Sequence, residues 1–258
     1  MTPPRARDVA GFVIAVAVAA GCVRLGVWQL DRLQQRRARN AQLRAARERP
    51  AVEARAGLTA DSAASRRVYA AGRYDYAHQR LWRARTYEGV PGVALVTPLR
   101  LADGSAVFVD RGWAPSPDAA HVDEQAYQEP DTADVLGLGF PAPRGRGDVD
   151  PARLQDSLLY PVLPFILQQL PPSAATGRES FRATARESFR ALYRPLPPGL
   201  MRWPAPALDD GPHLSYAIQW FSFAVIILGG SVALFRKSLA GGPGGSRHDA
   251  VRNPANYR

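Results

Sequence analysis

The sequence of 258 residues contains a single cysteine, and this scarcity excludes a fold held together by disulfide bonds. Cys22 stands inside an apolar run, where we expect a small buried side chain. Histidine is also rare, and the four histidines lack the paired spacing of a zinc site built from the chain alone. No nucleotide-binding loop, no Ser-His-Asp order and no pair of carboxylates in an apolar setting is recognisable. The sequence therefore predicts a protein that is not an enzyme.

Lysine is almost absent as well. Lys237 is the only one, so arginine carries nearly all of a formal charge of +10. This bias is typical of a GC-rich genome and favours a bacterial source. A charge of this size suits nucleic acid, anionic lipid or an anionic ligand. The arginines are spread along the chain without a nucleic-acid-binding motif, so we expect no nucleic acid partner.

Two long apolar runs are present, one toward each end of the sequence. The first covers residues 9–30, and its 22 residues would form a helix about 33 Å long, which is enough to cross a bilayer. A cleaved signal peptide is the alternative, but the run is long for one and no A-x-A cleavage site follows it. The second run covers residues 216–235 and contains no charge. The lipid bilayer is therefore an expected partner.

These runs predict a membrane protein with two transmembrane helices that flank an extracytoplasmic α+β domain with an antiparallel sheet. The predicted segments are a cytoplasmic N-terminal tail at residues 1–8, a first span at 9–30, the outer domain at 31–211, a second span at 212–235 and a disordered basic cytoplasmic tail at 236–258.

The charges beside the two spans favour opposite orientations. Acidic residues precede the second span and basic residues follow it, which places the C-terminus in the cytoplasm. The first span has two arginines before it and five soon after it, which favours the reverse. They are Arg5 and Arg7 before the span, and Arg32, Arg36, Arg37, Arg39 and Arg44 after it. We give the second span more weight, so both termini are expected in the cytoplasm.

Within the outer domain, the first helix is expected to continue through residues 31–49 until Pro50 ends it. Alternating or β-branched stretches predict strands at residues 66–75, 80–87, 93–101, 106–111 and 135–140. The sequence ADGS at 102–105 predicts a hairpin. Residues 141–206 are rich in proline and give no fold prediction, apart from a surface helix at 178–191 where RESFRA nearly repeats.

The best chemical candidate is His213, which stands just before the second apolar run. Pro212 suits the first turn of a helix, so His213 is expected at its start, at the outer bilayer surface. The positive helix end and partial burial both disfavour the imidazolium form, and a neutral imidazole is what a haem iron needs. The alternative is a capping or interfacial histidine that hydrogen-bonds the domain.

Aromatic and small residues share the helical face of His213. Tyr216 and Trp220 lie on it, with Ala217 and Ala224 between and beyond them. This pattern predicts either a slot for a flat ligand or a packing seam with the first helix.

A stripe on the first helix lies at the same membrane face. Arg24, Trp28 and Arg32 are four residues apart, and their arginines could hold haem propionates by bidentate bonds. Binding of lipid phosphate by Arg24 is the alternative.

Charged and glycine residues also mark the predicted strands. Asp110 and Arg111 are interpreted as an ion pair at a strand end, followed by Gly112 and Trp113. Gly72 and Gly112 are expected where strands turn or approach closely.

Several short segments occur in an order that points to one protein family. They are LGVWQLDR at 25–32, GRYD at 72–75, RARTY at 83–87 followed by Gly89 and PG at 91–92, TPL at 97–99, VDRGWAP at 109–115 and HLSYAIQWF at 213–221. Taken together they closely resemble the surfeit locus protein 1 family of cytochrome c oxidase assembly factors. The similarity covers residues 25–115 and 209–236.

The resemblance implies a two-span protein of the bacterial plasma membrane with its large loop outside. It implies a role in placing haem a into cytochrome c oxidase subunit I, beside the machinery that makes haem a, and haem iron binding by His213. A haem-free scaffold for oxidase subunits is the alternative. The predicted cofactor-binding residues are His213, Arg24, Arg32, Trp28, Tyr216 and Trp220, and the predicted structural motif is Gly72, Asp110, Arg111, Gly112 and Trp113.

Overall fold

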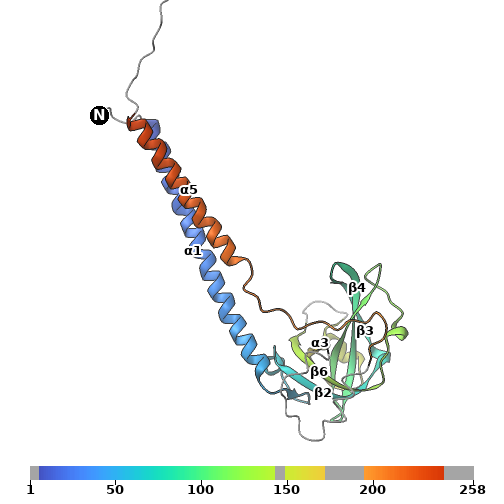
Figure 1. Cartoon of the computed structure of the whole chain (residues 1–258). Helices are drawn as coiled ribbons and strands as arrows, with labels where there is room; N and C mark the ends of the chain where they lie inside the picture. Colours follow the sequence, from blue (N-terminus) through green and yellow to red (C-terminus); the bar gives the residue numbers. More distant parts are fainter. Residues whose placement is uncertain (1–5, 143–148, 172–194, 241–258) are drawn as a thin grey trace, which may run out of the picture. The chain divides into compact units, whose positions relative to one another are not determined.

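The computed structural model describes residues 6–142, 149–171 and 195–240 (Figure 1). The chain divides into two compact units, Met1–Arg39 with Asp209–Arg258, and Asn40–Leu208. The first unit is a pair of helices and the second is a β domain. The surface helix predicted at 178–191 and the tail predicted at 241–258 lie outside the described residues.

Helix α1 (Ala6–Glu48) and helix α5 (His213–Ala240) each contain a stretch long and apolar enough to cross a membrane. The extension of α1 beyond the apolar run, and its end before Pro50, are confirmed. Large apolar side chains are exposed on both helices, among them Ile14 and Val225. Exposed apolar faces of this size are typical of a surface that lipid or another protein covers.

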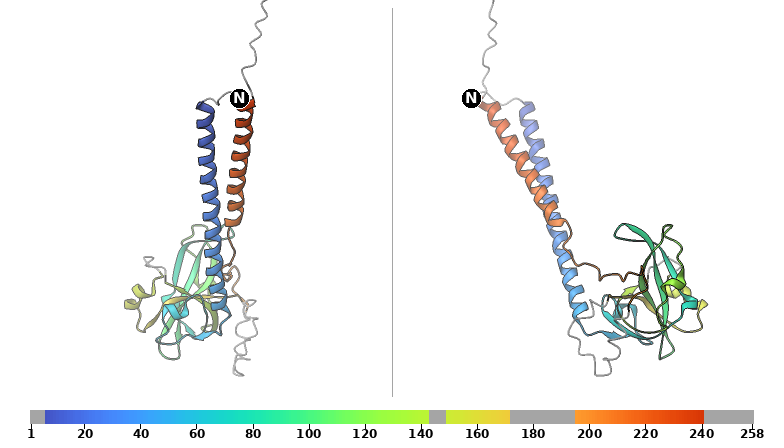
Figure 2. Two further views of the ribbon diagram at one scale, coloured as in Figure 1. Left: turned by 90° about the vertical axis from the view of Figure 1, so that its left-hand side faces the viewer. Right: turned by 45° about the vertical axis from the view of Figure 1, so that its right-hand side comes forward.

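The two helices lie side by side (Figure 2). Ala19 and Cys22 of α1 form a buried cluster with Ala224 of α5, which confirms the expected burial of Cys22. Gly26 allows a close approach, because a Cβ atom there would lie 2.7 Å from the ring of Phe221. Small residues thus bring the two backbones together, as is usual between membrane helices.

Among the described residues of the second unit, one sheet of seven strands forms the domain. The strands are β1 (Val52–Glu53), β2 (Arg67–Tyr74), β3 (Arg80–Tyr87), β4 (Val90–Leu101), β5 (Ala106–Pro115), β6 (Thr132–Pro141) and β7 (Val162–Gln169). Their order is β1-β2-β6-β7-β5-β4-β3, and β2 also pairs with β4. The pairings of β2, β6, β7, β5 and β4 therefore close into a ring.

In the described part of the domain, the helices are single turns. They are α2 (Ala60–Ala63) and α3 (Pro151–Leu154), with 3-10 turns η1 (Tyr76–His78), η2 (Glu124–Tyr127) and η3 (Gln155–Ser157). The prediction of an α+β domain is thus corrected to a β-rich domain. Side chains at alternate positions of the ring strands pack into one buried cluster that includes Val68, Leu99, Val109 and Leu167.

All five predicted strands are present, and the hairpin at 102–105 turns at Gly104 with a φ of +83°. The prediction of an antiparallel sheet is wrong in part, because β1 pairs with β2, and β5 with β7, in parallel. A closed ring of five strands cannot alternate direction throughout, so one neighbouring pair must be parallel. The pair β5–β7 fills that requirement, and β7 lies in the segment for which no fold was predicted.

Candidate functional site

His213 is the first residue of α5 and is half-buried. Its Nδ1 atom lies 2.9 Å from Oε1 of Gln29 on α1. Among the described residues, Nε2 of His213 has no hydrogen-bond partner. The helix pair therefore holds one nitrogen of this ring and leaves the other unbonded.

Ion pairs fix the start of α5 against α1. Arg36 donates from Nε to the carbonyl oxygen of Asp209 and from Nη2 to its Oδ1, both at 2.8 Å. Arg37 pairs with Asp210 at 2.8 Å. The carboxylate of Asp209 also accepts the N–H of Gly211, whose φ of +65° makes the turn into the helix. Two arginines that opposed the expected orientation are thus paired with the two aspartates that supported it.

The stripe of α1 is only partly assembled around this point. The guanidinium of Arg32 lies 5.5 Å from the centroid of the Trp28 ring, in a cation–π contact, and also donates to Gln35. Arg24 is exposed and lies about 140° around the helix from Gln29, which contacts His213, whereas Arg32 lies about 60° from Gln29. The structure therefore brings Trp28 and Arg32 together and leaves Arg24 on the side away from α5.

The face of α5 that carries Tyr216 and Trp220 is partly packed against α1 and partly exposed. Ala217 and Ala224 are buried, and Trp220 packs against the cluster that includes Ala224. Tyr216 is 47% exposed. The small residues of this face thus lie in a packing seam with α1, and Tyr216 lies at its edge.

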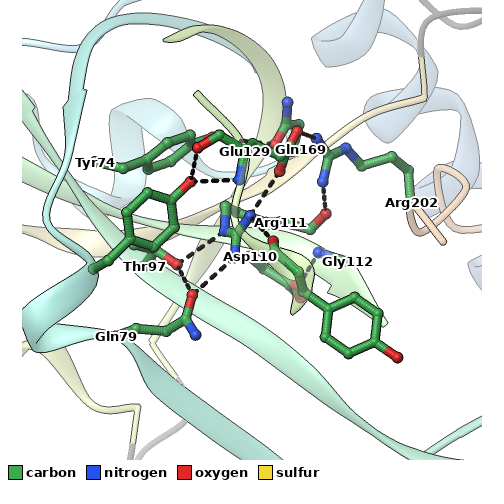
Figure 3. A network of polar contacts seen from close by, with 11 residues as sticks. Tyr74, Gln79, Thr97, Asp110, Arg111, Gly112, Glu129, Gln169 and Arg202 are labelled. Carbon is green, nitrogen blue, oxygen red and sulfur yellow. Dashed lines mark hydrogen bonds and ion pairs between the residues drawn. The ribbon is translucent and has the colours of Figure 1, made fainter. Parts of the chain in front are cut away.

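A second polar group of residues centres on Arg111 in the β domain (Figure 3). Its side chain is fully buried, yet every edge of the guanidinium has an acceptor. Nη1 donates to Oε2 of Glu129 at 2.8 Å and to the carbonyl of Tyr127 at 2.9 Å. Nη2 donates to Gln79 at 2.8 Å, and Nε to Thr97 at 3.0 Å. A buried charge is tolerated when its hydrogen bonds are satisfied in this way.

The partners of Arg111 are themselves paired. Arg202 donates to the carbonyl oxygen of Arg111 and to Oε1 of Glu129. Tyr76 donates its hydroxyl to the carbonyl of Glu129 and accepts the N–H of the same residue. The rings of Tyr74 and Tyr76 lie 5.5 and 5.1 Å from the guanidinium of Arg111, and burial raises the pKa of Tyr74. With its donors and acceptors satisfied, this network is suited to holding the fold.

The segment Asp110 to Trp113 is a β-bulge rather than a strand end. Between these two paired positions β5 has one residue more than its partner β4. Gly112 adopts a φ of +129°, and a Cβ atom there would lie 2.3 Å from the carbonyl oxygen of Met201. Only glycine fits such a position without strain.

The expected ion pair between Asp110 and Arg111 is replaced by other contacts. Asp110 accepts the N–H of Gly112 at 3.0 Å, whereas the acidic partner of Arg111 is Glu129. Adjacent side chains of a strand point to opposite faces, so neighbours in sequence are poorly placed to pair. Burial raises the pKa of Asp110 to about 6, although the Gly112 N–H and the positive charges of Arg85 and Arg202 act in the opposite direction.

Gly72 lies where β2 meets β4 and closes the ring. A Cβ atom there would lie 2.1 Å from the carbonyl oxygen of Arg100, so the backbones leave no room for a side chain. Trp113 packs directly against Gly92, since a Cβ atom at Gly92 would lie 2.3 Å from the indole nitrogen of Trp113. The predicted structural residues therefore mark the bulge and the closure of the ring.

Several residues of both sites were missed at the level of sequence. Gln79, Glu129 and Arg202 complete the Arg111 network, and no motif identified them. Gln29 had a usable signal, because it is a polar residue inside the first apolar run and follows the seam positions Cys22 and Gly26 at helical spacing. Its partner is 184 residues away, which no local pattern shows.

Comparisons with known proteins agree on one relationship. A sequence model of the SURF1 family matches residues 16–225, a range that includes the β domain and His213. The chain is 30% identical over 215 residues to an uncharacterized SURF1-like protein of Mycobacterium bovis, which covers 78% of this chain and 73% of that protein. Uncharacterized SURF1-like proteins from two strains of Mycobacterium tuberculosis show the same identity and coverage.

Proposed function

Because the chain belongs to the SURF1 family, we propose that it is a membrane-bound assembly factor of cytochrome c oxidase that binds haem a and helps to insert it into oxidase subunit I. Its partners are then subunit I and the machinery that makes haem a. The proposal gives the chain no catalytic step of its own. Its place is the plasma membrane of a bacterium, with two spans.

The observation that carries the proposal is the state of His213. Haem iron requires a neutral imidazole nitrogen with a free lone pair. His213 stands at the first turn of an apolar helix, with Nδ1 occupied by Gln29 and Nε2 without a partner among the described residues. The donor chemistry of this position therefore fits an axial ligand.

The residues around His213 differ in how well they could contact the propionates and the ring of a haem group. The guanidinium of Arg32, held over Trp28, has donors for a propionate, and Tyr216 and Trp220 supply ring surfaces on the first turns of α5. Arg24 lies farther around α1 from Gln29, at about 140° against about 60° for Arg32, so we assign Arg24 the smaller part. When bound, haem a would supply the redox iron that the oxidase needs, while this chain would hold and orient it.

The haem-free scaffold remains the second candidate, and one observation favours it. Ala217 and Ala224, which could have lined a slot for a flat ring, are buried in the seam with α1. A scaffold needs only the helix pair and the β domain. It does not need an imidazole nitrogen left without a partner.

The proposed topology has both termini in the cytoplasm and the domain outside. The charges beside the second helix support it, because Arg236 and Lys237 follow that helix, whereas Asp209 and Asp210 precede it. Reporter fusions at Ala120 and after the second helix test it. A reporter that is active only in the cytoplasm should be silent at Ala120, and activity there would overturn the topology.

Haem binding is tested by purifying the protein from a host that makes haem a and recording its visible spectrum. The wild-type protein should carry haem a, and His213→Ala should lose it or show an altered spectrum of the bound fraction. His121→Ala is the matched control, since His121 is an exposed histidine of the β domain. Wild-type stoichiometry and an unaltered spectrum in His213→Ala would leave the scaffold as the function.

A further inference from the structure

We infer that Gln29 is the positioning residue of the haem site, because its side-chain oxygen accepts the Nδ1–H of His213 and leaves Nε2 as the iron ligand. This inference rests on the proposed function. Its physical basis is a single contact of 2.9 Å between Oε1 of Gln29 and Nδ1 of His213.

The contact decides which nitrogen carries the proton. A neutral imidazole has one N–H donor and one acceptor nitrogen, and a carbonyl oxygen can only accept. With Oε1 facing Nδ1, the proton belongs on Nδ1 and the lone pair on Nε2. The hydrogen bond of the second nitrogen commonly sets the tautomer and the ring orientation of a metal-binding histidine.

Packing holds Gln29 in place for this role. It follows Gly26 by one helical turn on α1, and the next turn brings the buried side chain of Leu33. Gly26 lies against the Phe221 ring of α5, so the two helices are in contact one turn before Gln29. Gln29 is half-buried and thus faces α5, where it contacts His213.

The start of α5 is fixed along the direction of the helix axis as well. Arg36 is two turns beyond Gln29 and makes two hydrogen bonds to Asp209, four residues before His213. These exposed hydrogen bonds add a second contact between the start of α5 and α1, beyond the one between His213 and Gln29. The histidine is positioned from both sides, by the seam and by the ion pairs.

The other two described histidines provide an internal contrast. His78 pairs through Nδ1 with Asp75 at 2.9 Å, and His121 pairs through Nδ1 with Asp118 at 2.7 Å. Their partners are carboxylates, whereas the partner of His213 is the neutral amide of Gln29. Among the described histidines, only His213 faces an amide, and it is also the one at the edge of an apolar helix.

The first experiment needs no haem. The full-length protein, labelled with ¹⁵N-histidine and purified in detergent without haem, is examined by NMR at a pH where its histidines are neutral. The His213 signals are identified by their loss in His213→Ala. We expect a protonated Nδ1 and an unprotonated Nε2 in the wild type, and loss of this preference in Gln29→Leu. Gln34→Leu, the same change at an exposed position of α1, should leave it unaltered.

Two results would overturn the inference. The first is an unprotonated Nδ1 in the wild type, which would mean that the amide nitrogen faces the ring. The second is an unchanged tautomer in Gln29→Leu. Wild-type protease resistance of the β domain shows that a variant is folded.

The second experiment measures haem a retention in the same variants. Loss of an outer hydrogen-bond partner commonly weakens metal binding about 10–100-fold, and we expect a loss in this range for Gln29→Leu. Gln29→Glu keeps an acceptor for Nδ1–H, so it should retain haem a with a shifted spectrum. Full retention in Gln29→Leu would overturn the role of Gln29. Absence of haem a from the wild type would overturn the proposed function, even if the tautomer is as expected.

Discussion

The β domain and the helix pair differ in how completely the polar side chains at their centres are hydrogen-bonded. In the domain, the guanidinium of Arg111 is entirely buried and its N–H groups find acceptors on Glu129, Gln79 and Thr97. In the helix pair, the ring of His213 has one nitrogen bonded and one without a partner in the described part of the chain. A saturated network stabilises a fold but offers nothing to a ligand. The unsaturated group is where function is expected.

The largest effect should come from breaking the saturated network. Arg111→Met removes the donor to Thr97, one of the two donors to Gln79 and one of the two ion pairs of Glu129. Breaking a buried ion pair on one side typically lowers the free energy of unfolding by about 3–5 kcal/mol. Denaturation of the full-length protein in detergent, followed by tryptophan fluorescence, measures it.

The control is an exposed arginine of the same domain. Arg73 pairs with Asp131 at 2.8 Å on the surface, and exposed pairs contribute below about 1 kcal/mol. Similar losses in Arg73→Met and Arg111→Met would contradict the assignment of Arg111 as the centre of the fold.

The next largest effect concerns Asp110 and pH. Burial raises its pKa from 3.8 to about 6, so the folded domain binds this proton more tightly than the unfolded chain does. The stabilisation is complete below pH 4 and is lost as the pH rises through about 6, by roughly 3 kcal/mol at most. Asp110→Asn removes the titration. The difference in unfolding free energy between the two proteins should therefore change between pH 4 and 7, and a constant difference would contradict the raised pKa.

Substitutions at Gly72 and Gly26 compare how closely the β domain and the helix pair are packed. At Gly72 an added methyl group meets the carbonyl oxygen of Arg100, which belongs to the backbone and cannot move alone. At Gly26 it meets the ring of Phe221, which can turn aside. Gly72→Ala should destabilise the β domain by about 1–3 kcal/mol, as overpacking does, and Gly72→Glu by more. Gly26→Ala should have the smaller effect, because alanine also favours the helix.

Protease resistance of the β domain measures the changes at Gly72, and the amount of folded protein measures the changes at both glycines. Ala102→Glu, in the exposed hairpin turn, is the control for an added carboxylate. Unchanged resistance in Gly72→Glu would show that the ring tolerates a side chain at its closure.

The smallest effect is expected at the surface ion pairs of the helix pair. Arg36→Ala removes two hydrogen bonds to Asp209, but both side chains are exposed, so the loss should stay below about 1 kcal/mol. Thermal unfolding in detergent at low and high salt measures it, because salt screens exposed charges. A loss as large as that of Arg111→Met would mean that the two units do not differ in the way described.

Local patterns predicted what depends on neighbouring residues. Both apolar helices, the continuation of α1 to Glu48 and five strands follow from periodicity and from proline and glycine positions. The ring was not predictable, because β7 pairs with β5, which comes two strands earlier in the sequence. Parallel pairing likewise leaves no trace in a single strand.

The candidate site shows the same division. His213 was found from its position before an apolar run, and Trp28 and Arg32 from their spacing. Gln29 and Glu129 were missed, because each gains its role only from a residue brought close by folding. The partner of Arg111 was misassigned for this reason, since a strand turns adjacent side chains apart.

The ion pairs at the start of α5 also affect the unfolded state of the β domain. Arg36 and Asp209 are 173 residues apart, and their contact joins the two ends of the intervening chain into a loop. A covalent crosslink that closes a loop of this length would reduce the entropy of the unfolded chain by the equivalent of about 5 kcal/mol at 25 °C. The one cysteine, Cys22, is free, so the described residues contain no disulfide to do this. As long as the two helices stay together, they act as a non-covalent crosslink. The conformational entropy of the unfolded β domain, which lies between them in sequence, is then lower.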